Sequence, residues 1–389
     1  MADYAHITPI VLKWARESAR ISVESAASKV SVSPERLAYW EEGKSKPTIR
    51  QAQDLAKLYR RPFALFFLPD IPNDFQPLQD FRKRGSKSLS TASIFIIREI
   101  QQKQSWISEL KEENNEPKVP FVGRFSLKDN PIRVAEDILS TLGINPLNYE
   151  QYSPIKEWID KAESKGVFVS RTSFIHSRLT LDSSEIQGFA ISNEYAPFVF
   201  INSKDWGAAQ LFTLVHELAH LWIAQTGISN DIDSINNLKD VNHPVEAFCN
   251  EVAANALIPF EYISELKTHT TTPELVYQYS SKLGISSYAF IIRALKLNLI
   301  NLDEYSSLKA KVEAGFKEYL IREKEKKAKQ KDKDGGPSPY LLRLNKNGRL
   351  FTQIVLDAYK GGFVEPNIAS YLLNTPTNKF PKLEAQLYK

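Results

Sequence analysis

The sequence has a single cysteine, Cys249, and no long apolar run. One thiol excludes an internal disulfide. A helix needs roughly 18 consecutive apolar residues to span a bilayer, so we expect neither a membrane-spanning protein nor a membrane partner. The opening residues, Met-Ala-Asp-Tyr-Ala-His, carry neither the basic nor the apolar region of a signal peptide. Together these features predict a cytoplasmic protein.

The residues that are present are typical of a globular protein with two or three domains. The chain has 389 residues, of which 42% are hydrophobic and 25% charged, and its net charge is +4. Apolar periodicity and turn residues predict a mainly α fold with a small β-sheet, the α+β class. Strands are expected at 166–170, 186–192 and 198–202. The stretch 90–115 is expected to form a long solvated helix.

The pattern His-Glu-x-x-His occurs once, at His216, Glu217 and His220. The surrounding apolar stretch, 206–225, predicts a mostly buried helix. Residues four apart lie on one face of a helix, so the two imidazoles can hold one metal ion. Glu217 adjoins the first of them and can take a proton from a water at that ion. The pattern indicates a zinc site with Glu217 as general base, and spacing alone leaves Mn2+ open as the metal.

A catalytic zinc needs three protein ligands and one open position. Glu246 is the best candidate for the third ligand, because it lies on a second apolar helix expected at 245–257. Glu251 on the same helix and His243 just before it remain alternatives. A carboxylate at the start of a helix is also favoured by the helix dipole, whatever its function.

Two segments together resemble the ImmA/IrrE family of bacterial metallopeptidases. They are Phe212-Thr-Leu-Val-His-Glu-Leu-Ala-His220 and Glu246-x-x-Cys-Asn-x-Val-Ala-Ala-x-x-Leu-Ile-Pro259. The likeness covers residues 130–300, approximately, and implies a zincin-like peptidase domain.

Residue by residue, this resemblance implies His216, His220 and Glu246 as zinc ligands and Glu217 as general base. The sequence departs from the family pattern at Cys249, where alanine is commoner. Because both side chains are small, we interpret Cys249 as helix packing and not as a nucleophile.

Residues 9–68 resemble a helix-turn-helix domain of the XRE type. The likeness rests on short helices and on Trp40-Glu-Glu-Gly43 followed by Pro47-Thr48. In such a domain the third helix, here about 34–42, enters the major groove of DNA.

This likeness implies two kinds of DNA contact. A guanine edge would be read by Arg36, beside the exposed Tyr39, and phosphates would be bound by Lys44, Lys46 and Arg50. Three acidic residues on or beside the same helix would repel phosphate: Glu35, Glu41 and Glu42. The alternative is a helical domain kept for docking a partner or for dimerisation.

The predicted order is a helix-turn-helix domain (1–75), a helical linker (76–130), a peptidase domain (131–300), and a charged helical linker with a small C-terminal domain (301–389).

The resemblance to the ImmA/IrrE family implies cleavage of a transcriptional repressor. The leading hypothesis is therefore a zinc-dependent regulatory endopeptidase that binds DNA and cuts a repressor-like protein. The alternative is a transcriptional repressor or antitoxin that binds a PIN-like toxin, with proteolysis secondary or absent. A homodimer is compatible with both.

Overall fold

The computed structural model describes residues 3–72, 78–80, 88–151, 153–176, 179–229, 243–264, 271–331 and 337–389, with the backbone alone for 319–331. The chain divides into two compact units. Unit 1 comprises 1–77, 87–101 and 174–180, and unit 2 comprises the rest. Part of the linker expected at 76–130 lies outside the described residues. No described helix combines the length and the apolar character needed to cross a membrane.

Unit 1 begins with short helices, as the sequence predicts. They are α1 (Pro9–Ser18), α2 (Val23–Lys29), α3 (Pro34–Glu41), α4 (Ile49–Tyr59) and the 3-10 helix η1 (Phe63–Phe67). The hydroxyls of Ser22, Ser33 and Thr48 cap α2, α3 and α4 by accepting a backbone N–H three residues on. The helices enclose a small apolar core that includes Leu37 and Trp40.

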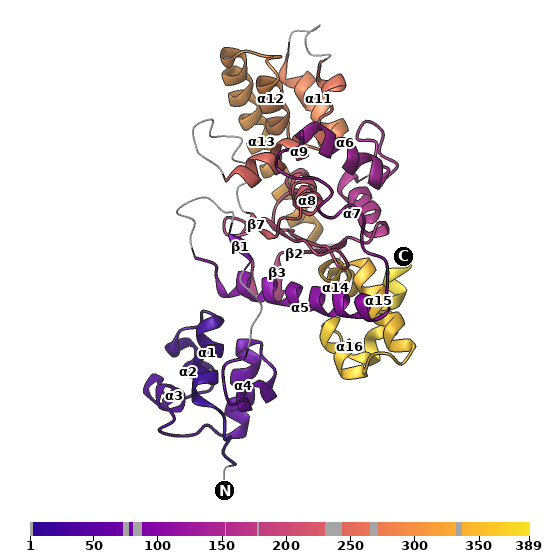
Figure 1. Ribbon diagram of the computed structural model, residues 1–389. Helices are drawn as coiled ribbons and strands as arrows, with labels where there is room; N and C mark the ends of the chain where they lie inside the picture. The colour runs from indigo at the N-terminus through magenta and orange to yellow at the C-terminus, as the bar shows by residue number, and fades with distance from the viewer. Residues whose placement is uncertain are drawn as a thin grey trace. The chain divides into compact units, whose positions relative to one another are not determined.

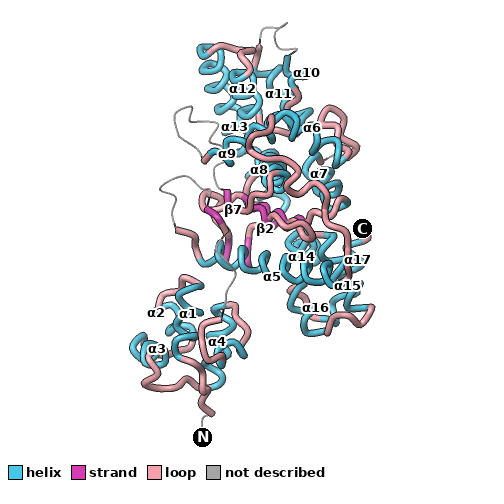
Figure 2. The backbone as a smooth tube through the Cα atoms, viewed as in Figure 1, coloured by secondary structure: helices cyan, strands magenta, loops and turns pink. Residues whose placement is uncertain are grey.

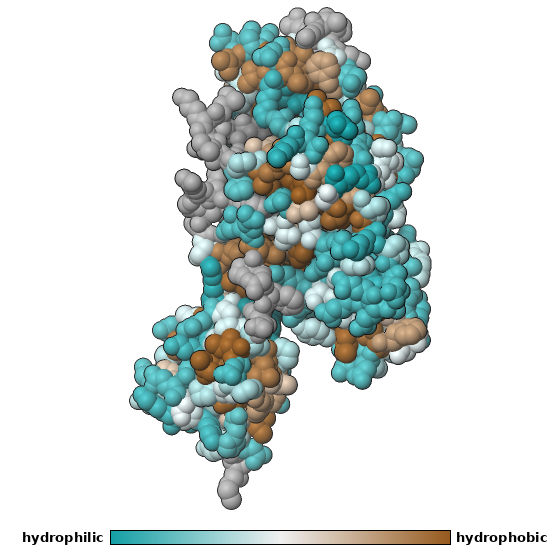
Figure 3. All heavy atoms as spheres, viewed as in Figure 1, coloured by the Kyte–Doolittle hydropathy of each residue, from teal (hydrophilic) through white to brown (hydrophobic). Residues whose placement is uncertain are grey.

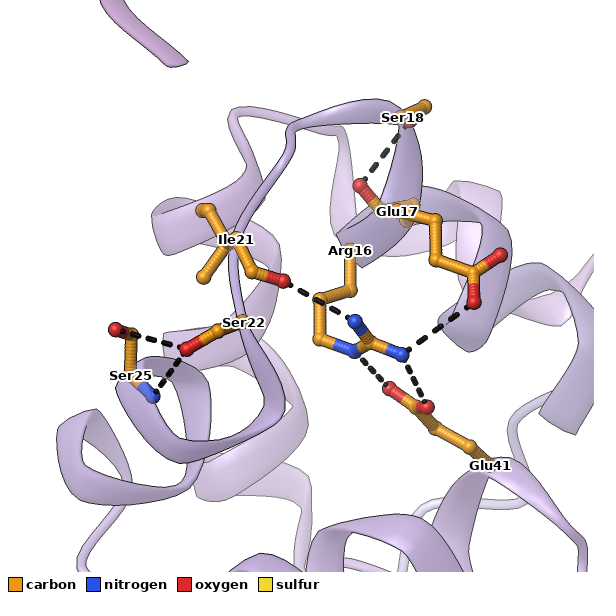
Figure 4. Close-up of polar contacts among 8 residues, drawn as sticks. Arg16, Glu17, Ser18, Ile21, Ser22, Ser25 and Glu41 are labelled. Atoms are coloured by element: carbon orange, nitrogen blue, oxygen red, sulfur yellow. Dashed lines mark hydrogen bonds and ion pairs between the residues drawn. The ribbon is translucent and has the colours of Figure 1, made fainter. Parts of the chain in front are cut away.

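A buried ion pair joins α1 to α3 inside this unit (Figure 4). Arg16 donates from Nε to Glu41 Oε1 at 2.7 Å and from Nη2 to Glu41 Oε2 at 2.8 Å. It also donates to the carbonyl of Ile21 at 3.1 Å. The hydrogen bond to Glu41 raises the pKa of Arg16 above its ordinary value. The expectation that Glu41 repels phosphate is therefore wrong, because its carboxylate is buried and neutralised by Arg16.

The surface of unit 1 leaves several large apolar side chains exposed, and brown areas mark such side chains in Figure 3. The unit also contains a short hairpin that the sequence did not predict, formed by β3 (Phe174–His176) and β4 (Leu179–Thr180).

Unit 2 is built on a mixed sheet with the strand order β1-β7-β5-β6-β2. Its strands are β1 (Gln79–Asp80), β2 (Phe168–Thr172), β5 (Gly188–Ile191), β6 (Phe198–Asn202) and β7 (Gly227–Ser229). β5 runs antiparallel to both β6 and β7, whereas β2 is parallel to β6 and β1 to β7. β2, β5 and β6 are the predicted strands, and their near-continuous burial indicates that both faces of the sheet are covered.

Helices lie on both sides of this sheet (Figures 1 and 2). The helices α8 (Gly207–Trp222) and α9 (Pro244–Leu257), both predicted, pack with α6 (Pro131–Leu142) and α7 (Pro154–Ser164) around the main core. The remaining helices before the C-terminal part are α10 (Phe260–Ile263), α11 (Pro273–Leu283), α12 (Ser287–Lys296) and α13 (Leu302–Lys331).

The C-terminal helices pack against the other face of the sheet. They are α14 (Pro339–Asn347), α15 (Arg349–Lys360), α16 (Pro366–Leu372), η4 (Thr377–Lys379) and α17 (Phe380–Leu387). The ring of Phe351 lies 6.1 Å from that of Phe198 on β6. Ser170 on β2 donates to the carbonyl of Lys346 at 2.6 Å. These contacts attach the C-terminal helices to the strands of unit 2.

The helix α5 (Thr91–Glu113) is not the solvated helix that its sequence predicts. Ile96, Ile100 and Ile107 are buried along it. In unit 2, Lys103 is also buried and donates to Asn347 Oδ1 at 2.9 Å. The polar residues of α5 make it look solvated in the sequence. A lysine is rarely buried without a partner, and the partner here, the side-chain amide of Asn347, lies far away in the sequence.

Candidate metal centre

The two histidines of the His-Glu-x-x-His pattern lie on α8, in the interior of unit 2. Every side chain from Gln210 to Trp222 is buried, so this stretch lies within the core. The four-residue spacing places His216 and His220 on one face, and their Nε2 atoms are 3.1 Å apart. Burying two imidazoles side by side is costly unless a further group engages them.

That further group is Glu246 on α9, which packs directly against α8. Glu246 Oε2 lies 3.2 Å from His216 Nε2, and Oε1 lies 3.1 Å from His220 Nε2. The ligand atoms of the three residues lie within 4.8 Å of one another, and all three residues are buried. The structure thus brings together the three residues proposed as ligands from the sequence.

The two alternative ligands lie elsewhere. Glu251 forms ion pairs with Arg293, at 3.3 Å, and with Lys296. His243 is exposed at the start of α9 and is not part of the cluster of ligand atoms. Cys249 is fully buried, and burial raises the pKa of its thiol well above the ordinary value. A thiol held neutral in this way suits packing, as the sequence interpretation has it.

Asn250 orients the first histidine. The His216 Nδ1–H donates to Asn250 Oδ1 at 3.0 Å, which leaves the Nε2 lone pair directed at the cluster. Asn250 lies one turn after Glu246 on α9, so the same face of one helix supplies a ligand and its support. Ser229 on β7 supports Glu246 by donating to its Oε1 at 3.3 Å.

Sequence reasoning assigned no role to Asn250 or Ser229. The spacing of four residues from Glu246 was the available signal for Asn250. Nothing local indicates Ser229, because the fold brings it from a separate strand.

The charges of the cluster favour a bound cation. Burial disfavours a charged His216, but the Glu246 carboxylate outweighs burial and raises the pKa of that imidazole. For His220 burial prevails and lowers the pKa. Burial also acts to raise the pKa of Glu246, but the two imidazoles outweigh it and lower that pKa. An ionised carboxylate facing two imidazoles is the donor set of a divalent metal such as zinc, so the residues fit the ion that the sequence predicts.

Glu217 is fully buried, and neither of its carboxylate oxygens accepts a hydrogen bond of good geometry from the described residues, although the hydroxyl of Ser229 acts to lower its pKa. Burial is the main cause that raises its pKa to about 8, and the nearby charge of His216 opposes this rise. Space for the carboxylate depends on Gly188 of β5, because a Cβ at Gly188 would lie 2.8 Å from Glu217 Oε1. A cation held by the three neighbouring residues would lower this pKa again, and the ionised carboxylate could then exchange a proton with a reactant.

In unit 1, the residues proposed to contact DNA are exposed. Arg36 and Tyr39 lie on α3, and Arg50 lies on α4. Lys44 pairs with Glu42 at 2.6 Å and lies over the ring of Tyr39 at 5.4 Å. Lys46 Nζ lies 2.9 Å from Nδ1 of His6. Arg36 and Arg50 therefore carry the most accessible charge of the group.

The fold and these residues define a metallopeptidase-like domain preceded by a helix-turn-helix domain. Residues 12–66 match the helix-turn-helix family, and residues 162–294 match the peptidase family described as the IrrE N-terminal-like domain. The chain therefore joins a helix-turn-helix domain to an IrrE-like peptidase domain, as its sequence predicts. No curated protein matches the chain.

Proposed function

We propose that this protein is a cytoplasmic, metal-dependent endopeptidase that cuts a repressor-like protein and binds DNA through its helix-turn-helix domain. One observation carries the proposal. His216, His220 and Glu246 converge from two helices, while the buried carboxylate of Glu217 beside them accepts no hydrogen bond of good geometry from the described residues. A purely structural metal site needs no such base.

His216, His220 and Glu246 would hold the ion, for which zinc is our first choice because two imidazoles and a carboxylate suit it. When bound, the metal supplies a Lewis acid that polarises the scissile carbonyl and acidifies water. The remaining chemistry belongs to Glu217. Its carboxylate accepts the proton of the attacking water and then delivers it to the leaving amine. Asn250 and Ser229 hold His216 and Glu246 in place.

The helix-turn-helix match supports DNA as a second partner. We propose that Arg36 and Tyr39 contact base edges and that Arg50, Lys44 and Lys46 contact phosphates, as their positions on or near α3 and α4 allow. Binding to DNA would place the peptidase near the repressor that it cuts.

The test is co-expression with the protein encoded by the neighbouring gene, using wild type, Glu217→Gln, and Glu261→Gln as an exposed control. Metal content is measured in parallel. We expect all three to hold metal, but wild type and Glu261→Gln alone to remove the neighbour. Cleavage by Glu217→Gln would contradict the mechanism. If wild type and Glu217→Gln bind and spare the neighbour equally, the protein is instead a binding module of the antitoxin kind.

A further inference from the structure

A small cavity, whose lining is more apolar than polar, lies between the first half of α8 and α12. Its volume is about 30 Å3, which by the space that a water needs corresponds to two or three water-sized groups. The cavity opens to solvent, because Trp206 at its edge is 41% exposed and several lining residues are half-buried. Its wall includes Ala209, Phe212 and Thr213 of α8 and Tyr288, Ala289 and Ile292 of α12.

This cavity begins one helical turn from the proposed general base. Ala209, Thr213 and Glu217 are spaced four residues apart on α8, so one face of the helix leads from the cavity to the carboxylate. The strand β5 makes the same connection. Gln187 lines the cavity, and the next residue, Gly188, has both Thr213 and Glu217 against its backbone. A substrate held over Glu217 therefore has the cavity beside it.

The lining indicates what the cavity accepts. Among the described residues, none of those that line it is charged. Two of its polar groups are already engaged, since Thr213 donates to the carbonyl of Ala209 at 3.0 Å and Ser286 accepts from the backbone N–H of Ala289 at 2.9 Å. A charged guest would lose its hydration without a partner, whereas an aliphatic guest would gain from burial.

We propose that this cavity receives an aliphatic side chain, of the size of valine or leucine, from the residue next to the bond that is cut. Ala289 and Ala209 keep the cavity open, because a larger side chain at either position would fill it. This inference rests on the proposed function, and it adds a substrate preference that the metal ligands do not determine.

The test uses straight-chain hydroxamic acids, because their head group binds a zinc ion while the tail explores the neighbouring space. Acetohydroxamate, butyrohydroxamate and hexanohydroxamate are titrated calorimetrically into the zinc-loaded full chain. Variants are Ala289→Phe and the milder Ala289→Val, with Ala310→Phe as a control that adds the same ring at an exposed position of α13. Burial of each methylene is worth about fourfold in affinity.

We expect wild type and Ala310→Phe to bind the longer tails about fifteenfold more tightly for each two methylenes until the cavity is full. Ala289→Val should reduce this gain, and Ala289→Phe should abolish it while keeping the affinity for acetohydroxamate. In peptide mixtures with one randomised position, wild type should prefer valine or leucine beside the cut, and Ala289→Phe should prefer glycine or alanine.

Two results would overturn the inference. One contradicts the pocket alone, and the other contradicts the proposed function as well. If acetohydroxamate binds but longer tails gain nothing, or gain equally in Ala289→Phe, the cavity is not a substrate pocket and the metal centre stands. If no hydroxamate binds the zinc-loaded wild type, the open metal position fails, and the proposed function and the pocket fail together.

Discussion

Gly188 shows how one missing side chain shapes the centre. A Cβ at this position would lie 2.6 Å from Thr213 Cγ2, 2.8 Å from Glu217 Oε1 and 3.0 Å from the carbonyl oxygen of Phe200. We expect Gly188→Ala to cost about 1–3 kcal/mol of unfolding free energy and to displace the Glu217 carboxylate. Cleavage should fall sharply while zinc content is kept. Gly207→Ala is the matched control, because no atom of the described residues lies within 4 Å of the Cβ it would add. Equal cleavage rates in the two variants would show that Gly188 does not position the base.

Asn250 contacts His216, one of the proposed ligands, so we expect its removal to change metal affinity more than stability. Because the hydrogen bond to Nδ1 fixes the ring, Asn250→Ala should weaken zinc binding about 10–100-fold. Asn250→Asp keeps an acceptor oxygen and should stay close to wild type. Competition with a chromophoric chelator measures the zinc affinity of both variants. An Asn250→Ala affinity within twofold of wild type would mean that packing alone orients His216.

At this scale the sequence singled out the residues that the structure brings together, but not the residues that support them. The spacing of His216 and His220 is a local property of one helix, so a pattern of five residues reveals it. The choice of Glu246 over Glu251 depends on which face of α9 meets α8. Periodicity left this choice open, and the family likeness favoured Glu246. Ser229 reaches Glu246 from a strand that is separate in the sequence, so no local pattern indicates this contact.

Among the elements, α7 and α15 meet at a buried carboxyl group. Glu163 Oε1 accepts from the backbone N–H of Leu350 at 3.3 Å, and a Cβ at Gly348 would lie 2.9 Å from the same oxygen. Burial, the main cause, raises the pKa of Glu163 to about 8. At neutral pH the carboxyl group of Glu163, which lies beside the start of α15, is therefore uncharged.

This carboxyl group should make stability depend on pH. The ordinary pKa of a glutamate is 4.5 and that of Glu163 is about 8, so between these values the folded protein keeps a proton that the unfolded chain releases. The free energy of unfolding should then fall as pH rises from 4.5 to 8, by on the order of 1 kcal/mol per unit, and level off above 8. Glu163→Gln should lose less stability across this window. Urea unfolding at pH 5, 6, 7 and 8 tests this, and parallel curves for wild type and variant would refute it.

The order of the elements was largely predictable, whereas the burial of the longest polar ones was not. The helices of unit 1 have local caps and β2, β5 and β6 have apolar runs, so short-range patterns indicate them. The burial of α5 has no local signal, because the partner of its buried Lys103 is Asn347, far along the chain. The C-terminal helices looked separate for a similar reason, since Phe351 meets Phe198 only in the folded sheet.

For the whole molecule, the two proposed activities reside in different compact units. The proposed metal ligands and Glu217 all belong to unit 2, whereas the exposed residues of α3 belong to unit 1. Each unit has its own apolar core, one around Leu37 and Trp40 and one around α8. A substitution on the surface of one unit should therefore leave the other unit's activity intact.

This separation can be measured on the full chain with a DNA fragment from upstream of its own coding sequence. Arg36→Ala removes a side chain placed to read a base edge, so specific affinity should fall about 10–100-fold. Arg50→Ala removes a phosphate contact and should lower the slope of log affinity against log salt by about 1. Both variants should cut the co-expressed neighbour as wild type does, while Glu217→Gln should bind the fragment normally without cutting. If Arg36→Ala left affinity unchanged, the helix-turn-helix domain would be serving a protein partner, and if it abolished cleavage, DNA binding and proteolysis would be coupled through the chain.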